Sequence, residues 1–233
     1  MLKVLTSAAA AAWLLSATAA LGAAATTPKV SAQWKEGQHY FLIVPAQPTA
    51  VPQGKVEVRE VFSYGCPACN HFVPVMRKLK QSLPPNAVVN FLPAGFNPAE
   101  DWPMFQRAYV TAQMLGIADT THEAMFDAVW KTGDLAIIDQ GTGQLKARLP
   151  TIEDAARFYN RTAGVSVADF VAAAKSMGAD TQIGQADDML ARYRVSATPT
   201  MIINGRYRLD VPSAGGPEEL VELVKWLVAK ESH

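Results

Sequence analysis

Stretches in which polar and apolar residues alternate, or in which apolar residues run together, predict the strands of this chain. The clearest is 56–63, which alternates at first and is continuously apolar at its end, as in a strand that enters a covered sheet. Asn204-Gly205 suits a type I′ turn and predicts a two-residue hairpin. The predicted strands are 39–44, 56–63, 87–92, 200–203 and 206–209.

Apolar residues at helical spacing occupy most of the remaining chain. Helix 66–83 lies between two predicted strands, and this order predicts a right-handed parallel unit. Thr151 and Ser166 each precede an aspartate by three residues, which is typical of helix N-caps. The chain is therefore of the α/β class, with a helical block of about 90 residues between two strand-bearing parts. The predicted helices are 66–83, 102–115, 121–130, 152–159, 167–174, 181–193 and 217–230.

Charge and the first residues bear on partners and location. The 233 residues include 21 basic and 21 acidic side chains, so no basic excess indicates nucleic-acid binding. Residues 1–25 contain Lys3, then an apolar run, then small residues at Ala23-Ala24-Ala25, a pattern that predicts a cleaved signal peptide. A membrane anchor is the alternative, but the many alanines make the segment weakly apolar. Export would place the mature protein where disulfides persist.

Two cysteines carry the candidate chemistry. Cys66-Pro67-Ala68-Cys69 follows a predicted strand and opens a predicted helix. The first N–H groups of a helix lack partners and its dipole is positive there, so both effects lower the pKa of the Cys66 thiol. Pro67 suits the first turn, where its missing N–H costs nothing. We expect Cys66 to be an exposed nucleophile and Cys69 its more shielded resolving partner.

Other interpretations of this pair explain less. A structural disulfide closing a four-residue loop would add only about 2 kcal/mol by chain entropy. A zinc site needs about four ligands, and the sequence offers no second close pair. Covalent haem needs histidine directly after the second cysteine, but position 70 is Asn70. Redox chemistry by the cysteine pair alone, without metal or cofactor, is the prediction.

The segment Phe62-Ser-Tyr-Gly-Cys-Pro-Ala-Cys69, followed by a helix, resembles the thioredoxin superfamily. The helical block before the final hairpin and helix makes the chain similar to the DsbA family of thiol:disulfide oxidoreductases. This resemblance implies an α/β thioredoxin-like fold with an inserted helical domain. The implied division is a signal peptide at 1–25, a thioredoxin-like core at 26–97 and 196–233, and the helical domain at 98–195.

The resemblance also assigns roles to residues outside the cysteine motif. Thr198-Pro199 stands where family members have a cis-proline, and the Thr198 backbone would pair with an extended substrate beside Pro67 and Ala68. Glu60 matches a buried acid that moves the proton of the deeper cysteine, and an apolar strand should raise its pKa. The alternatives are an ordinary turn proline and a Glu60 that points outward from an edge strand.

Two positions depart from the family pattern. The lysine that often accompanies the buried acid is replaced by Asn90, and Ala68 occupies the place of a histidine that favours the thiolate. We therefore expect a less oxidising protein than a histidine-bearing relative.

The function implied is oxidation of reduced, unfolded exported proteins in the periplasm, with a quinone-linked membrane oxidoreductase restoring the disulfide. A periplasmic reductase or isomerase and, from another class, a redox-inactive peptide-binding chaperone are the alternatives.

Overall fold

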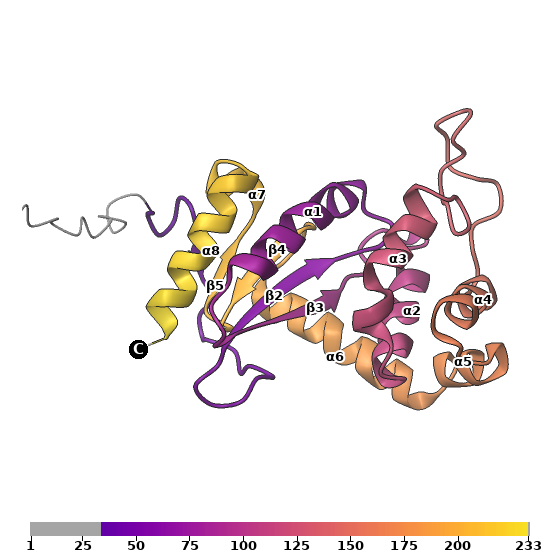
Figure 1. Ribbon diagram of the computed structural model, residues 1–233, viewed down its shortest axis with the longest axis horizontal. Coiled ribbons are helices and arrows are strands. Elements are labelled where there is room, and N and C mark those ends of the chain that lie inside the picture. The colour runs from indigo at the N-terminus through magenta and orange to yellow at the C-terminus, as the bar shows by residue number, and fades with distance from the viewer. Residues whose placement is uncertain (1–33, 233) are drawn as a thin grey trace, which may run out of the picture. The chain divides into compact units, whose positions relative to one another are not determined.

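A mixed sheet of five strands lies at the centre of the computed structural model, which describes residues 34–232 (Figure 1). The strand order is β1-β5-β4-β2-β3. Strands β2 and β3 run parallel, as predicted for the strand-helix-strand unit, and the other pairs are antiparallel. The strands are β1 (Phe41–Leu42), β2 (Val56–Phe62), β3 (Ala87–Pro93), β4 (Thr200–Ile203) and β5 (Tyr207–Leu209).

The hairpin and the first strand differ from their predictions. Asn204 and Gly205 both have positive φ, as the predicted turn requires, but the connection has a third residue, Arg206. The Arg206 N–H closes the turn on the Ile203 carbonyl, and its own carbonyl accepts from the N–H of Ile43, so it stays outside the β4–β5 ladder. The predicted strand 39–44 is reduced to β1, which pairs with the edge of the sheet over two residues.

Helices form at every predicted place. The caps at Thr151 and Ser166 are confirmed, because each side chain accepts the N–H of the aspartate three residues on. The short helices η2 and α7 were not predicted. None of the helices in the described residues is long and apolar enough to cross a membrane. The helices are α1 (Pro67–Ser82), η2 (Pro98–Glu100), α2 (Trp102–Met114), α3 (Ala118–Trp130), α4 (Ile152–Ala163), α5 (Val167–Ala174), α6 (Met177–Tyr193), α7 (Val211–Ala214) and α8 (Pro217–Glu231).

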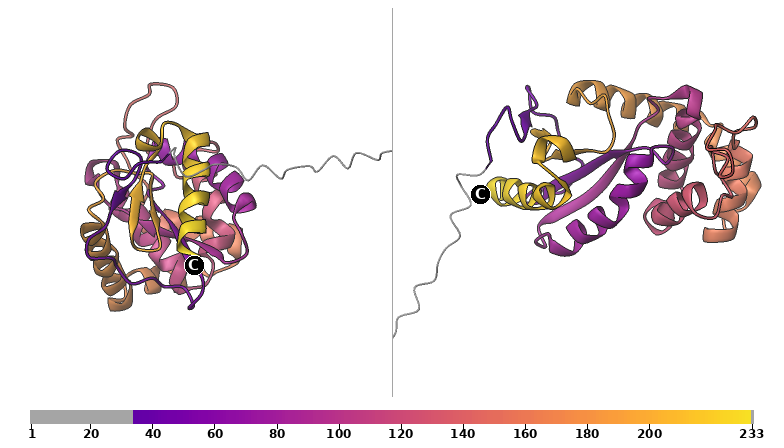
Figure 2. Two further views of the ribbon diagram at one scale, coloured as in Figure 1. Left: turned by 90° about the vertical axis from the view of Figure 1, so that its left-hand side faces the viewer. Right: turned by 90° about the horizontal axis from the view of Figure 1, so that it is seen from above.

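Strand β2 is buried along its whole length because helices cover both faces of the sheet (Figure 2). Successive side chains of a strand point to opposite faces. Val58 and Phe62 pack in the core that includes α1 and α8, whereas Val61 packs against Leu190 of α6. Glu60 therefore lies on the α1 face, and Arg59 lies on the α6 face.

The helical block shares its core with the sheet. Phe62 makes an edge-to-face contact with Tyr109 of α2, and Tyr64 makes one with Phe126 of α3, with ring centroids 4.9 Å and 5.0 Å apart. Such pairs add about 0.5–1.5 kcal/mol each beyond the burial of their area. These contacts hold the helices against the end of β2 from which the cysteine motif follows. The signal-peptide prediction lies outside the described residues, and the domain boundaries stay a prediction.

Candidate active site

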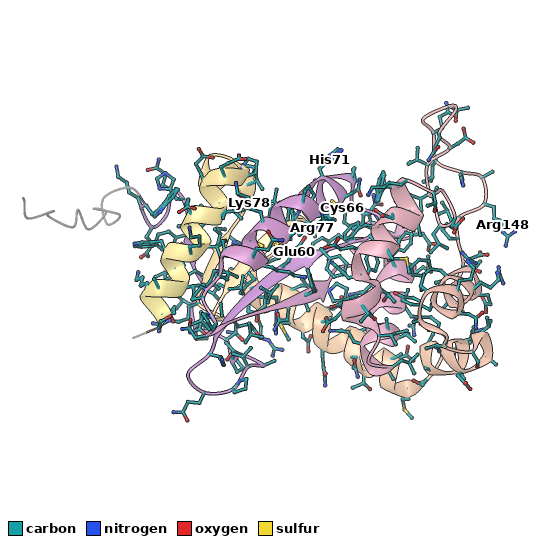
Figure 3. All side chains as sticks on the ribbon, viewed as in Figure 1. Glu60, Cys66, His71, Arg77, Lys78 and Arg148 are labelled. Carbon is teal, nitrogen blue, oxygen red and sulfur yellow. The ribbon has the colours of Figure 1, made fainter. Side chains whose placement is uncertain are left out.

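Cys66 is the N-cap of α1, with extended backbone angles and its sulfur 3.4 Å from the backbone N–H of Cys69 (Figure 3). The two cysteines are free thiols in this structure. Cys69 is fully buried, as predicted for the resolving cysteine. Cys66 is only 4% exposed, so the prediction that it is an exposed nucleophile was wrong, although it is less deeply buried than Cys69. The loop that contains Thr198 lies against the Cys66 sulfur.

The two thiols differ strongly in acidity. The pKa of Cys66 is lowered to about 6, first by a hydrogen bond from the Cys69 thiol and then by the Thr198 side chain and the backbone N–H groups of Cys69 and Ala68. Burial raises the pKa of Cys69 well above its usual value, and the hydrogen bond to Cys66 raises it further. The predicted backbone contribution is present, but the largest one comes from the second thiol. Cys66 is therefore the thiol that ionises first.

The peptide bond between Thr198 and Pro199 is cis, as the resemblance implied. The Cys66 thiol donates to the Thr198 carbonyl oxygen, with 3.5 Å between sulfur and oxygen. The Thr198 hydroxyl is buried and, within the described residues, has no hydrogen-bond partner. A hydroxyl in this position can donate to the sulfur once Cys66 is a thiolate.

The turn before Cys66 is held by two tryptophans that the sequence analysis did not identify. The indole N–H of Trp130 donates to the Tyr64 carbonyl at 2.8 Å. Trp102 packs so closely over Gly65 that a Cβ at this position would lie 2.7 Å from its ring. Only glycine fits there, and the close packing fixes where the helix begins.

Glu60 is buried in β2, an interior strand of the sheet, which excludes the outward, edge-strand alternative. Its pKa is raised to about 8, chiefly by burial. The charge of Lys80 lowers the pKa of Glu60 and a charge on Cys66 raises it. The Glu60 charge in turn contributes to the raised pKa of Cys69. Glu60 is thus electrostatically linked to both thiols, and its pKa suits proton transfer near neutrality.

Asn90 does not stand opposite Glu60, so the inference that it replaces the accompanying lysine was wrong. The register pairs Asn90 with Arg59, on the α6 face of the sheet. There its side-chain amide accepts from Arg59 at 2.8 Å and donates to Glu57 at 2.8 Å. The cation near Glu60 is Lys80 of α1, which lines the same small cavity as Glu60 and lies 4.6 Å from the ring centroid of Phe91.

His122 is a further buried residue on this face that the sequence did not single out. It is 5% exposed, its Nδ1 lies 3.0 Å from the Tyr64 hydroxyl, and burial lowers its pKa to about 3. His122 is therefore neutral near pH 7, and it places no charge beside Glu60. Only its position in the fold reveals it, because an isolated histidine on an apolar helix face has no distinguishing sequence pattern. Within the described residues, no group of three or more acidic, histidine or cysteine side chains could hold a metal ion.

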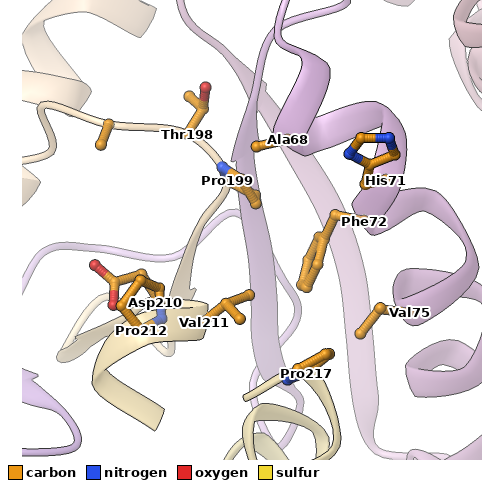
Figure 4. Close-up of a pocket in the computed structure, with 11 residues that line it drawn as sticks. Ala68, His71, Phe72, Val75, Thr198, Pro199, Asp210, Val211, Pro212 and Pro217 are labelled. Atoms are coloured by element: carbon orange, nitrogen blue, oxygen red, sulfur yellow. The ribbon is translucent and has the colours of Figure 1, made fainter. Parts of the chain in front are cut away.

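An apolar groove of about 440 Å³ lies beside the cysteine motif (Figure 4). Its walls come from α1, the loop containing Pro199, and the segments that begin α7 and α8. Ala68 and His71 are exposed at its edge. Pro67 is also exposed but does not line the groove. Of the four predicted substrate-binding residues, Ala68, Thr198 and Pro199 therefore line this groove.

Comparisons with known proteins agree with this geometry. Residues 51–225 match a family model described as thioredoxin. The chain is 35% identical over 199 residues to the thiol:disulfide interchange protein DsbA of Pseudomonas syringae pv. tomato, covering 84% of each chain. The crystal structure of Pseudomonas aeruginosa DsbA is 31% identical, with a TM-score of 0.69 and 85% and 94% of the two chains covered. That of DsbA from Xylella fastidiosa is 29% identical, with a TM-score of 0.72 and 84% and 96% covered.

Proposed function

The chain belongs to the DsbA family of thiol:disulfide oxidoreductases and has its thioredoxin-like fold with a helical insertion, α2–α6, and we propose that it oxidises exported proteins in the periplasm. The single observation that carries the direction of electron flow is the unequal acidity of the two thiols. A stabilised Cys66 thiolate favours the reduced form of the protein, so its disulfide is a good electron acceptor.

The reaction begins with the Cys66–Cys69 disulfide. A substrate thiolate attacks the sulfur of Cys66, the bond to Cys69 breaks, and Cys69 leaves as a thiolate. A second thiolate of the substrate then attacks the substrate's own sulfur in the mixed disulfide, and Cys66 leaves as a thiolate. The substrate loses two electrons and the cysteine pair gains them.

Glu60 supplies the proton that this exchange requires. The Cys69 thiolate released in the first step is buried and strongly basic, so it must take up a proton. A carboxyl with a pKa of about 8 holds a proton near neutrality and can release it. We assign proton donation to Cys69, and its reversal, to Glu60.

Substrate binding uses the surface around Cys66. The Thr198 backbone would pair with an extended polypeptide by strand addition, next to the exposed Pro67 and Ala68. The groove beside Pro199 would take an apolar side chain of that polypeptide. This geometry favours unfolded chains, because a folded protein rarely offers an extended cysteine-bearing segment.

Membership of the family and the sequence of residues 1–25 support a periplasmic setting. A signal peptide would bring the chain to the periplasm, where its substrates are exported proteins that still carry thiols. Continued turnover needs an oxidant, for which we propose a quinone-linked membrane oxidoreductase.

A redox titration against glutathione, combined with the pH profile of thiolate absorbance, tests the direction. We expect a reduction potential well above that of thioredoxin, about −270 mV, and a Cys66 that ionises below neutrality. A potential near the thioredoxin value would instead support a reductase. Full activity of Cys66→Ala in cells would support a redox-inactive chaperone.

A further inference from the structure

A second pocket, of about 140 Å³, lies beside the apolar groove and shares Ala197 and Asp210 with it. It is formed by the end of α6, the start of the cis-proline loop and strand β5. Its lining includes Arg194 and Arg208, and we call it the basic pocket. A polypeptide that pairs with Thr198 and continues past Ala197 would reach this pocket.

The side chain of Arg208 is held in place by contacts within the protein, whereas Arg194 is fixed through its backbone. The Arg208 guanidinium lies 5.6 Å from the ring centroid of Phe41 and donates to the carbonyl of Arg194. Arg194 ends α6 with a positive φ of 55°, which turns the chain sharply toward the cis-proline loop. A guanidinium fixed by stacking and a hydrogen bond loses little freedom when it binds an anion.

Neither arginine is neutralised by a close partner. Within residues 34–232, the salt bridges involve other arginines and lysines, and no carboxylate lies within 4.0 Å of Arg194 or Arg208. Asp210 also lines the basic pocket, but one of its oxygens accepts the Ser213 N–H and caps α7. Two cations against one carboxylate leave a net positive charge at this end of the substrate surface.

We propose that the basic pocket binds an acidic side chain of the substrate polypeptide, so that preferred substrates carry an apolar residue on one side of the cysteine and an acidic residue on the other. This inference rests on the proposed oxidase function. An extended chain advances about 3.3 Å per residue, so residues within a few positions of the cysteine can reach both the groove and the basic pocket. The ion pair would form at a partly exposed site, where one pair contributes modestly to affinity.

The test measures oxidation of single-cysteine peptides by the oxidised protein, followed as formation of the mixed disulfide. One set of peptides has leucine before the cysteine and aspartate, serine or lysine after it, and a second set has the reverse order. The variants are Arg194→Asn, which tolerates the positive φ, and Arg208→Gln. Arg192→Gln is the matched control, because Arg192 lies exposed in the last turn of α6 and does not line the basic pocket.

In one of the two orders, we expect the aspartate peptide to react about two- to fivefold faster than the lysine peptide, with a smaller ratio at high salt. Arg194→Asn and Arg208→Gln should each reduce this ratio, and Arg192→Gln should leave it unchanged. Comparing one peptide across variants cancels the effect of its charge on its own thiol. Equal rates for all charges, or an unchanged ratio in both variants, would overturn the basic pocket and leave the oxidase intact. Absence of any peptide oxidation would overturn both.

Discussion

Position 68 lies between the two cysteines and contributes only its backbone N–H to the Cys66 thiolate. A histidine there would add a polar or charged ring beside the sulfur. We expect Ala68→His to lower the pKa of Cys66 further and to raise the reduction potential. Each unit by which the pKa falls stabilises the thiolate by about 1.4 kcal/mol relative to the thiol. Titration against glutathione measures the change. Ala68→Gln, which is similar in size but never charged, controls for altered contacts at the groove, and a potential that rises equally in both variants would contradict this account.

Thr198 offers a second residue-scale test, because its buried hydroxyl has no partner within the described residues while Cys66 is a thiol. Its side chain is one of the groups that lower the pKa of Cys66. Thr198→Val keeps the shape and removes the hydroxyl, so the pKa of Cys66 should rise and the protein should become less oxidising. Thiolate absorbance against pH reports the first effect and the glutathione titration reports the second. Thr198→Ser, which keeps a hydroxyl, should restore most of both.

Lys80 faces Glu60 from α1, and its charge is the one that lowers the pKa of that carboxyl. We expect Lys80→Met to raise the pKa of Glu60 above about 8, because burial is then opposed by less positive charge. An NMR titration of the Glu60 side-chain carboxyl carbon measures it directly. Lys78→Met removes an exposed charge from the same helix and should change the titration little. Equal shifts in the two variants would mean that Lys80 affects the pKa of Glu60 no more than Lys78 does.

At the scale of elements, patterns within one segment predicted well. The alternation that becomes continuous in 56–63, the cap at Thr151 and the turn at Asn204-Gly205 are all determined locally, and the corresponding strand, helix start and turn are present. Strand 39–44 was predicted too long, because the length of an edge strand depends on how far its neighbour pairs with it. Helix α7 has four residues, too few for periodicity to be visible.

The same distinction, between features that depend on one segment and features that depend on its neighbours, holds for the candidate site. The cysteine motif, the buried Glu60 and the cis-proline could be named from local pattern and resemblance. The neighbours of Glu60 could not, because they depend on the register between β2 and β3 and on the packing of α1 and α3. A shift of one residue in that register places a side chain on the other face, which is why Asn90 was assigned wrongly.

The junction between β2 and α1 provides a test of element geometry. Gly65→Ala would bring a Cβ to 2.7 Å from the Trp102 ring, and we expect a loss of about 1–3 kcal/mol in the free energy of unfolding. Gly184→Ala is a control of opposite sign, because Gly184 is exposed inside α6 with nothing within 4 Å of an added Cβ. It should stabilise by up to about 1 kcal/mol. Urea unfolding measures both, and equal stability of Gly65→Ala and the parent would show that the turn is not tightly packed.

At the scale of the whole molecule, the acidity of Cys66 links redox state to stability. Its pKa is about 6 in the folded, reduced protein and near the ordinary value of 9.0 in the unfolded chain. A lowered pKa stabilises the folded state above the unfolded value, and this stabilisation is lost as the pH falls through the folded value. The disulfide form has no titrating thiol at this position. The stability of the reduced form relative to the oxidised form should therefore increase between about pH 6 and about pH 9.

Urea unfolding of both redox forms across this range tests the linkage. Most disulfides stabilise the proteins that contain them. If the stability of the reduced form rises with pH relative to that of the oxidised form, the Cys66–Cys69 disulfide does not behave as a structural disulfide. Glu60 acts differently: its raised pKa of about 8 lowers the stability of the folded state progressively from about pH 4.5 to about pH 8. Glu60→Gln should remove that decline, while the reduced form still gains stability relative to the oxidised form as the pH rises. A gap that does not change with pH would mean that Cys66 ionises alike in the folded and unfolded chain, and the proposed direction of electron flow would lose its physical basis.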